Sequence, residues 1–254
     1  LCEIYNLCAE KSRYDNLCFA HEDIQFDTIG WGEKIIPKLS ETDCGVIGFA
    51  GTTARISALC GIGLSRAHWR SNYIQHMNKG GMKSCFKNPD RVEFSPVVSV
   101  DGMCLFVSRK VWQEVRFDEK TFPNFHLYDL DFTTAVFRAG YINYICNTVI
   151  VEHFSEGYYT QEWLAATIDF NNKWRGALPL YVSGFPCIKN LDRYVRSREF
   201  RFIKAMMKSR GKCSWELIDG LCRQYYRKYP FYRSIVVWFH AYRYRKRWKR
   251  EGRL

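Results

Sequence analysis

The chain has 254 residues, which is enough to bury one large domain or a domain with an appendage. Its content of 47 % hydrophobic and 17 % aromatic residues excludes a disordered chain. The formal net charge of +12 makes nucleic acid, anionic lipid and phosphorylated substrates the candidate partners. Residues 225–254 carry ten Lys or Arg against one acid, Glu251. We therefore expect an ordinary domain with a basic tail, and no nucleic-acid partner.

The eleven cysteines are scattered, and no two have C-x-x-C spacing. This pattern is typical of reduced, buried thiols and predicts a cytoplasmic protein without a structural zinc site. No run of eighteen apolar residues predicts a transmembrane helix. The first residues lack the basic and apolar regions of a signal peptide. Because the chain does not begin with Met, we expect the start of the protein to lie outside it.

Hydrophobic spacing predicts alternating helices and strands over the first two thirds of the chain. Helices are expected at residues 1–13, at 28–39, from 109, up to Ala139 and at 162–174, and strands at 17–20, 45–51, 96–107 and 141–151. The long polar segment 52–95 is interpreted as a functional or mobile loop. From residue 190 onward the sequence predicts helices that are interrupted at Gly211, Gly220 and Pro230.

Polar clusters follow strand-like segments at four places, namely His21-Glu22-Asp23, Asp101-Gly102, Tyr128-Asp129-Leu130-Asp131 and His153. Open α/β sheets bind ligands beyond the carboxyl ends of their strands. Carboxylate oxygens beside an imidazole can hold a divalent cation and, through it, a phosphate. Each cluster alone also has an ordinary structural interpretation: a solvated strand end, a turn, an acidic first helical turn or a structural histidine.

In this order the motifs resemble the GT-A glycosyltransferases, in particular their family-2-like group. The similarity covers residues 1–175 and rests on Phe19-Ala20-His21-Glu22-Asp23-Ile24, Gly48-Phe49-Ala50-Gly51, Val100-Asp101-Gly102, Phe125-His126-Leu127-Tyr128-Asp129-Leu130-Asp131-Phe132, Arg138-Ala139-Gly140-Tyr141 and His153-Phe154-Ser155. The resemblance implies an α/β fold with a Rossmann-like mixed sheet flanked by helices, here without the family's first strands. The catalytic domain is expected at residues 1–180, and a helical, basic and aromatic extension at 181–254.

The resemblance also implies a metal site. Asp23 takes the place of the second acid of the family's D-x-D motif, and His153 matches a histidine that completes metal coordination. These two residues would bind Mn²⁺ or Mg²⁺ on the diphosphate of the donor. His21 replaces the first acid in an H-x-D variant, and both His21 and Glu22 are assigned to donor or acceptor binding.

A second group of residues is assigned to the acceptor side. Asp129 matches the general base of the family's E-D motif, with Tyr128 where a Glu usually stands. Asp131 is expected to orient the following helix or the acceptor. Asp101 and Gly102 lie where the donor and acceptor sugars meet.

These assignments imply a metal-dependent, inverting, hexosyltransferase-type glycosyltransferase. It would move a sugar from a nucleotide-diphosphate sugar, a UDP-sugar, to a glycan or lipid-linked acceptor in surface polysaccharide or glycoconjugate synthesis. The chemistry suits these residues, because a cation neutralises a leaving diphosphate and a carboxylate can take the acceptor's proton. The alternative is a non-catalytic basic protein that binds a membrane or nucleic acid on a degenerate transferase fold. The absent first strands and His21 in place of an acid favour that alternative.

The basic tail has a helical pattern of its own. A helical wheel places Phe231, Ile235, Trp238, Phe239 and Tyr242 on one side. Amphipathic helices with aromatic and basic residues lie in membrane interfaces, so peripheral contact with the inner membrane face is expected. A helix packed on the catalytic domain with a solvated basic end, and a nucleic-acid patch, are the alternatives.

Overall fold

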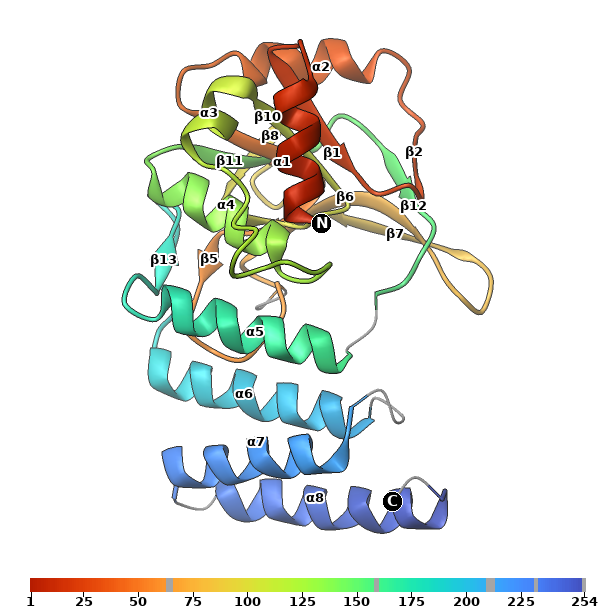
Figure 1. The fold of residues 1–254 in the computed structure, drawn as a ribbon, viewed down its shortest axis with the longest axis vertical. Coiled ribbons are helices and arrows are strands. Elements are labelled where there is room, and N and C mark those ends of the chain that lie inside the picture. The colour runs from red at the N-terminus through yellow and green to blue at the C-terminus, as the bar shows by residue number, and fades with distance from the viewer. Residues whose placement is uncertain (63–65, 158–159, 209–212, 231–232, 253–254) are drawn as a thin grey trace. The chain divides into compact units, whose positions relative to one another are not determined.

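The computed structural model describes residues 1–62, 66–157, 160–208, 213–230 and 233–252, which form two compact units. The N-terminal unit comprises residues 1–56, 61–157 and 176–187. The helical unit comprises residues 57–60, 158–175 and 188–254. The predicted fold class is confirmed, because mixed sheets flanked by helices are followed by C-terminal helices (Figure 1).

One sheet of the N-terminal unit has five strands in the order β1 (Asn16–Ala20), β10 (Cys104–Ser108), β3 (Cys44–Gly48), β11 (Ile142–Cys146) and β8 (Phe94–Val97). The pair β3–β11 is parallel, and the other pairs are antiparallel. The β3 strand is buried along its whole length, as expected of an apolar central strand.

A second sheet orders β2 (Ile24–Phe26), β12 (Val151–His153), β6 (Trp69–His76), β4 (Ala50–Thr52) and β9 (Ser99–Val100), with β7 (Met82–Lys87) also paired to β6. Two short strands, β5 (Ala54–Arg55) and β13 (Leu180–Tyr181), pair separately. In this second sheet β12 lies antiparallel to β2 and parallel to β6. The register brings the last residue of β12, His153, opposite Ile24 and beside Gln75.

The expectation of a continuous loop over residues 52–95 is wrong, because β6 and β7 form a long antiparallel hairpin there. Part of the polar composition that predicted a loop belongs to β6 side chains that are buried and paired, whereas β7 is polar because most of it is exposed. Arg70 Nε donates to Asp90 Oδ2 at 2.7 Å, and Asn72 Nδ2 donates to the carbonyl oxygen of Val149 at 2.7 Å. A buried polar side chain with partners does not oppose strand formation.

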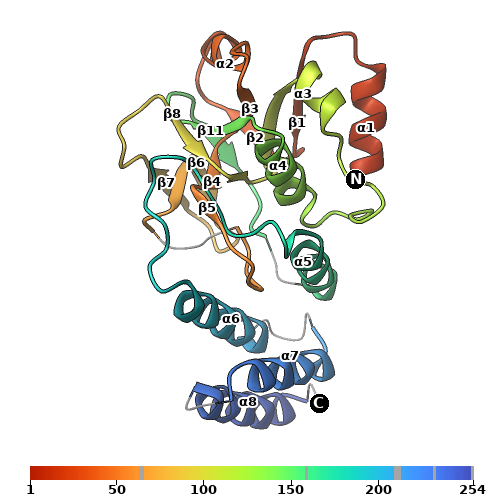
Figure 2. The same cartoon turned by 90° about the vertical axis from the view of Figure 1, so that its left-hand side faces the viewer.

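Helices α1 (Cys2–Lys11), α2 (Trp31–Leu39), α3 (Arg109–Glu114) and α4 (Tyr128–Arg138) flank the strands of this unit, and among the described residues the side with β7 and β8 carries no helix of the unit (Figure 2). Helix α2 packs on β3 and β10, and α4 packs on β3, β9 and β11. Ile35 and Leu39 of α2 join Ile47 and Phe106 of the sheet in one buried core. The predicted end of α4 is confirmed, since Gly140 follows its cap with a positive φ of 101°.

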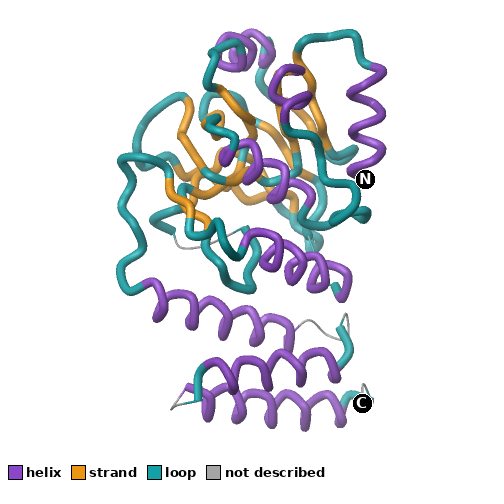
Figure 3. Tube along the Cα trace, turned by 60° about the vertical axis from the view of Figure 1, so that its left-hand side comes forward, coloured by secondary structure: helices purple, strands orange, loops and turns teal. Residues whose placement is uncertain are grey.

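The described part of the helical unit contains four helices, which are drawn in purple in Figure 3 with the other helices: α5 (Gln161–Trp174), α6 (Leu191–Lys208), α7 (Trp215–Lys228) and α8 (Arg233–Arg250). Leu164 of α5, Met206 of α6, Ile218 of α7 and Val237 of α8 share one core. The predicted interruption at Gly220 is wrong, because Ile218 and its buried neighbours outweigh the roughly 1 kcal/mol that glycine costs a helix. Gly211 lies outside the described residues.

Among the described residues, no helix is long and apolar enough to cross a membrane. All eleven cysteines lie in described segments and are free thiols, as the sequence predicted. Seven of them are buried, whereas Cys8, Cys18 and Cys187 are exposed and Cys85 is half-buried.

Candidate functional site

Three side chains that can bind a metal gather at the edge of the second sheet. His21 follows β1, Asp23 precedes β2, and His153 ends β12. One ligand atom from each lies within 4.8 Å of the other two. His153 Nε2 is 3.6 Å and His21 Nδ1 is 3.9 Å from Asp23 Oδ1. The fold thus brings the predicted pair Asp23 and His153 together, and His21 joins them.

Paired backbone holds these three residues in place. The backbone nitrogen of His21 donates to the carbonyl oxygen of Met103 at 3.0 Å, which extends the β1–β10 ladder. The nitrogen of Phe154 donates to the carbonyl oxygen of Asp23 at 2.9 Å, which extends the β2–β12 ladder. The cluster therefore stands on two rigid strand pairs rather than on a free loop.

Gln75 fixes the orientation of His153. Its Nε2 lies 2.9, 3.2 and 2.7 Å from the carbonyl oxygens of His76, His153 and Ser155, so this end of the amide must be the donor. Its Oε1 is then the acceptor that lies 3.2 Å from His153 Nδ1, and Nδ1 carries the proton. The lone pair of His153 is therefore on Nε2, the nitrogen that faces Asp23.

Tyr128 fixes the orientation of His21. The Tyr128 hydroxyl lies 3.2 Å from the carbonyl oxygen of Gly102, to which it donates, and 3.0 Å from His21 Nε2. Burial raises the pKa of Tyr128, so the phenol stays protonated. Because the hydroxyl group of Tyr128 donates its proton in the hydrogen bond to Gly102, its oxygen acts as the acceptor for His21 Nε2–H. The lone pair of His21 is then on Nδ1, which faces Asp23.

This arrangement fits a divalent metal ion. His153 Nε2 is buried and makes no hydrogen bond with any residue in the described segments. Burial lowers the pKa of His21, which keeps its imidazole neutral and able to ligate. Two imidazole nitrogens and one carboxylate suit a first-row transition ion such as Mn²⁺ better than Mg²⁺, which prefers oxygen ligands throughout.

Asp129 lies in the first turn of α4, close to Asp101 and Gly102. Its Oδ2 accepts from the nitrogen of Gly102 at 2.8 Å. Burial and then the negative charge of Asp101 raise the pKa of Asp129 from 3.8 to about 7. A carboxylate with a pKa near neutrality is matched to general-base catalysis at physiological pH.

Gly102 allows this close approach. A Cβ at this position would lie 2.5 Å from the Tyr128 hydroxyl and 2.8 Å from Asp129 Cβ. Helix α4 is fixed to the strand before Gly102, because the backbone nitrogen of Val100 donates to Thr133 Oγ1 at 3.1 Å. The steric limit therefore explains why glycine stands here.

Hydrogen bonds connect the metal-ligating cluster to Asp129. The path runs from His21 Nε2 to the Tyr128 hydroxyl, from there to the carbonyl oxygen of Gly102, and from the Gly102 nitrogen to Asp129 Oδ2. The candidate base and the candidate metal ligands thus belong to one site.

The remaining predicted residues lie around this site. Asp101 is half-buried and accepts from the nitrogen of Met103 at 3.2 Å. Glu22 is exposed. Asp131 is only 2 % exposed, on the buried side of α4. Its depth favours the predicted role in orienting the helix over direct contact with an acceptor.

Sequence reasoning missed two residues of the site. Gln75 lies in the segment interpreted as a loop, and its role depends on the pairing of β6 with β12, which no local pattern signals. The centre of the Phe125 ring lies 5.5 Å from that of the His21 ring, so this residue of the segment before α4 packs beside one member of the cluster. The sequence shows an apolar residue before the polar start of α4, but it does not indicate that this residue contacts His21.

A family model described as "Glycosyltransferase like family" matches residues 1–173. The matched range contains every candidate site residue from His21 to His153, and it ends before α6 begins. No curated protein matches the chain.

Proposed function

The chain belongs to this glycosyltransferase-like family and is a GT-A-like glycosyltransferase, and we propose that it transfers a sugar from a nucleotide-diphosphate donor in a metal-dependent reaction with inversion. The observation that carries the proposal is the orientation of the two histidines. Both present a lone pair to Asp23, which is the arrangement a bound cation requires.

His21, Asp23 and His153 are the proposed metal ligands, so that His21 and Asp23 act as an H-x-D form of the family motif. A bound divalent cation would neutralise the diphosphate leaving group as a Lewis acid. Gln75 and Tyr128 hold the two imidazoles in the ligating tautomer. The ligand set favours Mn²⁺ over Mg²⁺.

Asp129 is the proposed general base, which takes the proton of the acceptor hydroxyl. The hydrogen bond from Gly102 and the N-terminus of α4 orient its carboxylate. Attack by the activated hydroxyl on the side opposite the leaving diphosphate gives inversion at the anomeric carbon. Burial and the charge of Asp101 raise the basicity of Asp129, and Gly102 permits the close approach of Asp129 to the strand end.

The donor and acceptor follow from the family resemblance alone. We propose a UDP-sugar as donor, a hexosyl group as the transferred unit, and a glycan or lipid-linked acceptor in surface polysaccharide or glycoconjugate synthesis. For the helical unit we propose peripheral contact with the inner membrane face. The exposed side chains Ile235, Trp238, Phe239 and Tyr242 of α8 support it, whereas Phe231 lies outside the described residues.

The rival reading, a non-catalytic binding protein on a degenerate fold, has less support. A protein that has lost catalysis is no longer selected to keep its metal-ligating atoms close together. The separation of 3.6 Å between Asp23 Oδ1 and His153 Nε2, and the pKa of about 7 at Asp129, instead support an enzyme.

A panel of nucleotide sugars tests the proposal. The full-length protein is assayed for nucleotide release with Mn²⁺, with Mg²⁺ and with chelator. We expect Mn²⁺-dependent turnover of one donor, abolished in Asp23→Ala and kept in Asp27→Ala, which removes an exposed acid outside the cluster. Asp129→Asn should lower kcat by about 10²- to 10⁴-fold. Binding of no donor by the intact protein would favour the binding protein.

A further inference from the structure

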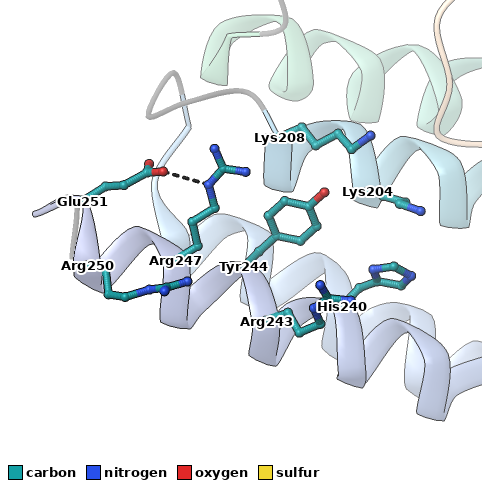
Figure 4. A pocket seen from close by; sticks show the side chains of 8 residues that line it. All are labelled: Lys204, Lys208, His240, Arg243, Tyr244, Arg247, Arg250 and Glu251. Carbon is teal, nitrogen blue, oxygen red and sulfur yellow. Dashed lines mark hydrogen bonds and ion pairs between the residues drawn. The ribbon is translucent and has the colours of Figure 1, made fainter.

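The helical unit contains a cationic groove between α6 and α8 with a volume of about 640 Å³. Figure 4 shows Lys204 and Lys208 on α6, across from the side chains that α8 contributes to the groove. Its lining, which we call the α6–α8 groove, consists of Lys204, Lys208, His240, Arg243, Tyr244, Arg247, Arg250 and Glu251. The family match ends before both helices, so nothing in the transferase site accounts for this groove.

The charge of the groove is poorly compensated. Five Lys or Arg side chains line it against one acid, Glu251, which accepts from Arg247 Nε at 2.7 Å. Within the described segments, Lys204, Lys208, Arg243 and Arg250 form no ion pair. Burial, and then the positive charges of Lys204, Arg243 and Lys208, lower the pKa of His240. Their ammonium and guanidinium groups therefore converge on one space, which favours a bound anion.

The residue types indicate phosphate oxygens as the ligand. Arg guanidinium groups bind phosphate in a bidentate manner, and Lys ammonium groups add compact positive charge. Tyr244 and His240 lie among these cations and supply further polar atoms. The volume of the groove exceeds that of one phosphate, so it suits a phosphate that carries a further group.

The adjoining side of α8 is apolar and exposed. Ile235, Trp238, Phe239 and Tyr242 are 65, 58, 50 and 51 % exposed. Arg243 joins the two surfaces, because its guanidinium lies 5.6 Å from the centre of the Phe239 ring while its side chain lines the groove. An aromatic and aliphatic face beside phosphate-binding cations is the composition of a helix that lies in a membrane interface.

We propose that the α6–α8 groove binds the phosphate of an anionic lipid headgroup while the exposed face of α8 enters the membrane interface. This inference deepens the membrane contact proposed above and names its site and ligand chemistry. Nucleic acid fits less well. Base stacking needs open aromatic faces, and Tyr242 already stacks with Trp238 at 5.9 Å and lies under the ammonium of Lys246.

Vesicle sedimentation of the full-length protein, without donor or metal, tests the proposal. The vesicles are phosphatidylcholine alone, or phosphatidylcholine with a minority of phosphatidylglycerol. The groove variant is Lys204→Gln with Arg243→Gln. The matched control is Arg245→Gln with Lys249→Gln, which removes equal charge from exposed positions of α8 outside the groove. All four positions avoid the buried core, so both variants should fold.

We expect binding to the anionic vesicles only, weakened about tenfold in the groove variant and clearly less in the control. Equal losses in the two variants would overturn the site, because net charge would then suffice. If inorganic pyrophosphate saturates the groove but the protein does not bind the vesicles, the phosphate does not come from a lipid. If the protein binds a single-stranded RNA more tightly than the vesicles, the ligand is a nucleic acid. Sugar transfer to a soluble acceptor is measured separately, so failure here leaves the transferase proposal standing.

Discussion

Gln75 Oε1 lies 3.2 Å from His153 Nδ1, and this one hydrogen bond turns the lone pair of His153 toward Asp23. The relationship joins β6 to the end of β12, two strands that are far apart in the sequence. A residue outside the candidate ligand set therefore determines which nitrogen of His153 is available to a metal. Partners of this kind, behind the ligands, commonly tune metal affinity.

Gln75→Leu should weaken Mn²⁺ binding about 10- to 100-fold, because His153 loses the acceptor that fixes its tautomer. Isothermal titration of the metal into the full-length protein measures the affinity, and thermal unfolding shows whether the variant is folded. Gln25→Leu is the control, since Gln25 is exposed on β2 and pairs with Asp27 at the surface. Unchanged Mn²⁺ affinity in a folded Gln75→Leu protein would contradict the role of Gln75.

Asp129→Asn should stabilise the metal-free protein at alkaline pH. The folded-state pKa of about 7 lies above the ordinary value of 3.8, so folding disfavours the ionised carboxylate. This cost is absent below the ordinary pKa, grows as pH rises between the two values and is complete above the folded-state pKa. The amide cannot ionise and keeps an oxygen for the Gly102 nitrogen.

Urea unfolding in chelator is the measurement for this variant. We expect the unfolding free energy of Asp129→Asn to exceed that of the wild type by about 4 kcal/mol near pH 8 and to match it closely near pH 4. A variant that is less stable than the wild type at both pH values would show that the carboxylate is structural.

The pH dependence of kcat/KM should report the same carboxylate. A general base must be deprotonated, so the rate should rise with pH through a value near 7 in the free enzyme. Asp101→Asn removes a negative charge that raises the pKa of Asp129, so the acid limb should move to lower pH. Asp27→Asn serves as the control for charge. If the acid limb of the profile stays at the same pH in Asp101→Asn, the ionisation of Asp129 is not its cause.

Gly102→Ala should lose activity and stability together. The added Cβ would lie 2.5 Å from the Tyr128 hydroxyl and 2.8 Å from Asp129 Cβ, so either α4 or the Asp101-Gly102 turn must move. Overpacking of this kind costs about 1–3 kcal/mol. Gly176→Ala is the matched control, because a Cβ there meets nothing within 4 Å. Full activity in Gly102→Ala would show that the clash is relieved without cost to the site.

The sequence predicted the elements whose burial follows a simple period. Strand β1 and helix α4 appeared close to their expected bounds, because apolar spacing and the Gly140 cap reflect their packing directly. Helix α1 also formed near its expected bounds, but it buries Cys2, Asn6 and Ala9 and leaves Ile4 and Leu7 exposed. The β6–β7 hairpin was not predicted, because Arg70 and Asn72 of β6 are polar and yet buried with hydrogen-bond partners. Local pattern carries no information about such distant pairings.

The candidate site divides in the same way. Asp23, His153 and Asp129 were predicted because they end or begin elements in an order that resembles a known family. Gln75 and the hydroxyl contact of Tyr128 with His21 depend on strand register and helix placement. The elevated pKa of Asp129 likewise depends on its burial and on the approach of Asp101 in space. Three-dimensional packing supplied these features, and no spacing in the sequence contains them.

Pulsed electron paramagnetic resonance of Mn²⁺ bound to the full-length protein tests the metal centre most directly. The modulation of the echo detects nitrogen nuclei that ligate the ion. His21, Asp23 and His153 as ligands predict coupling to two imidazole nitrogens, with one coupling lost in His153→Ala and the other in His21→Ala. Bound Mn²⁺ without imidazole coupling, or a spectrum that neither variant changes, would contradict this assignment.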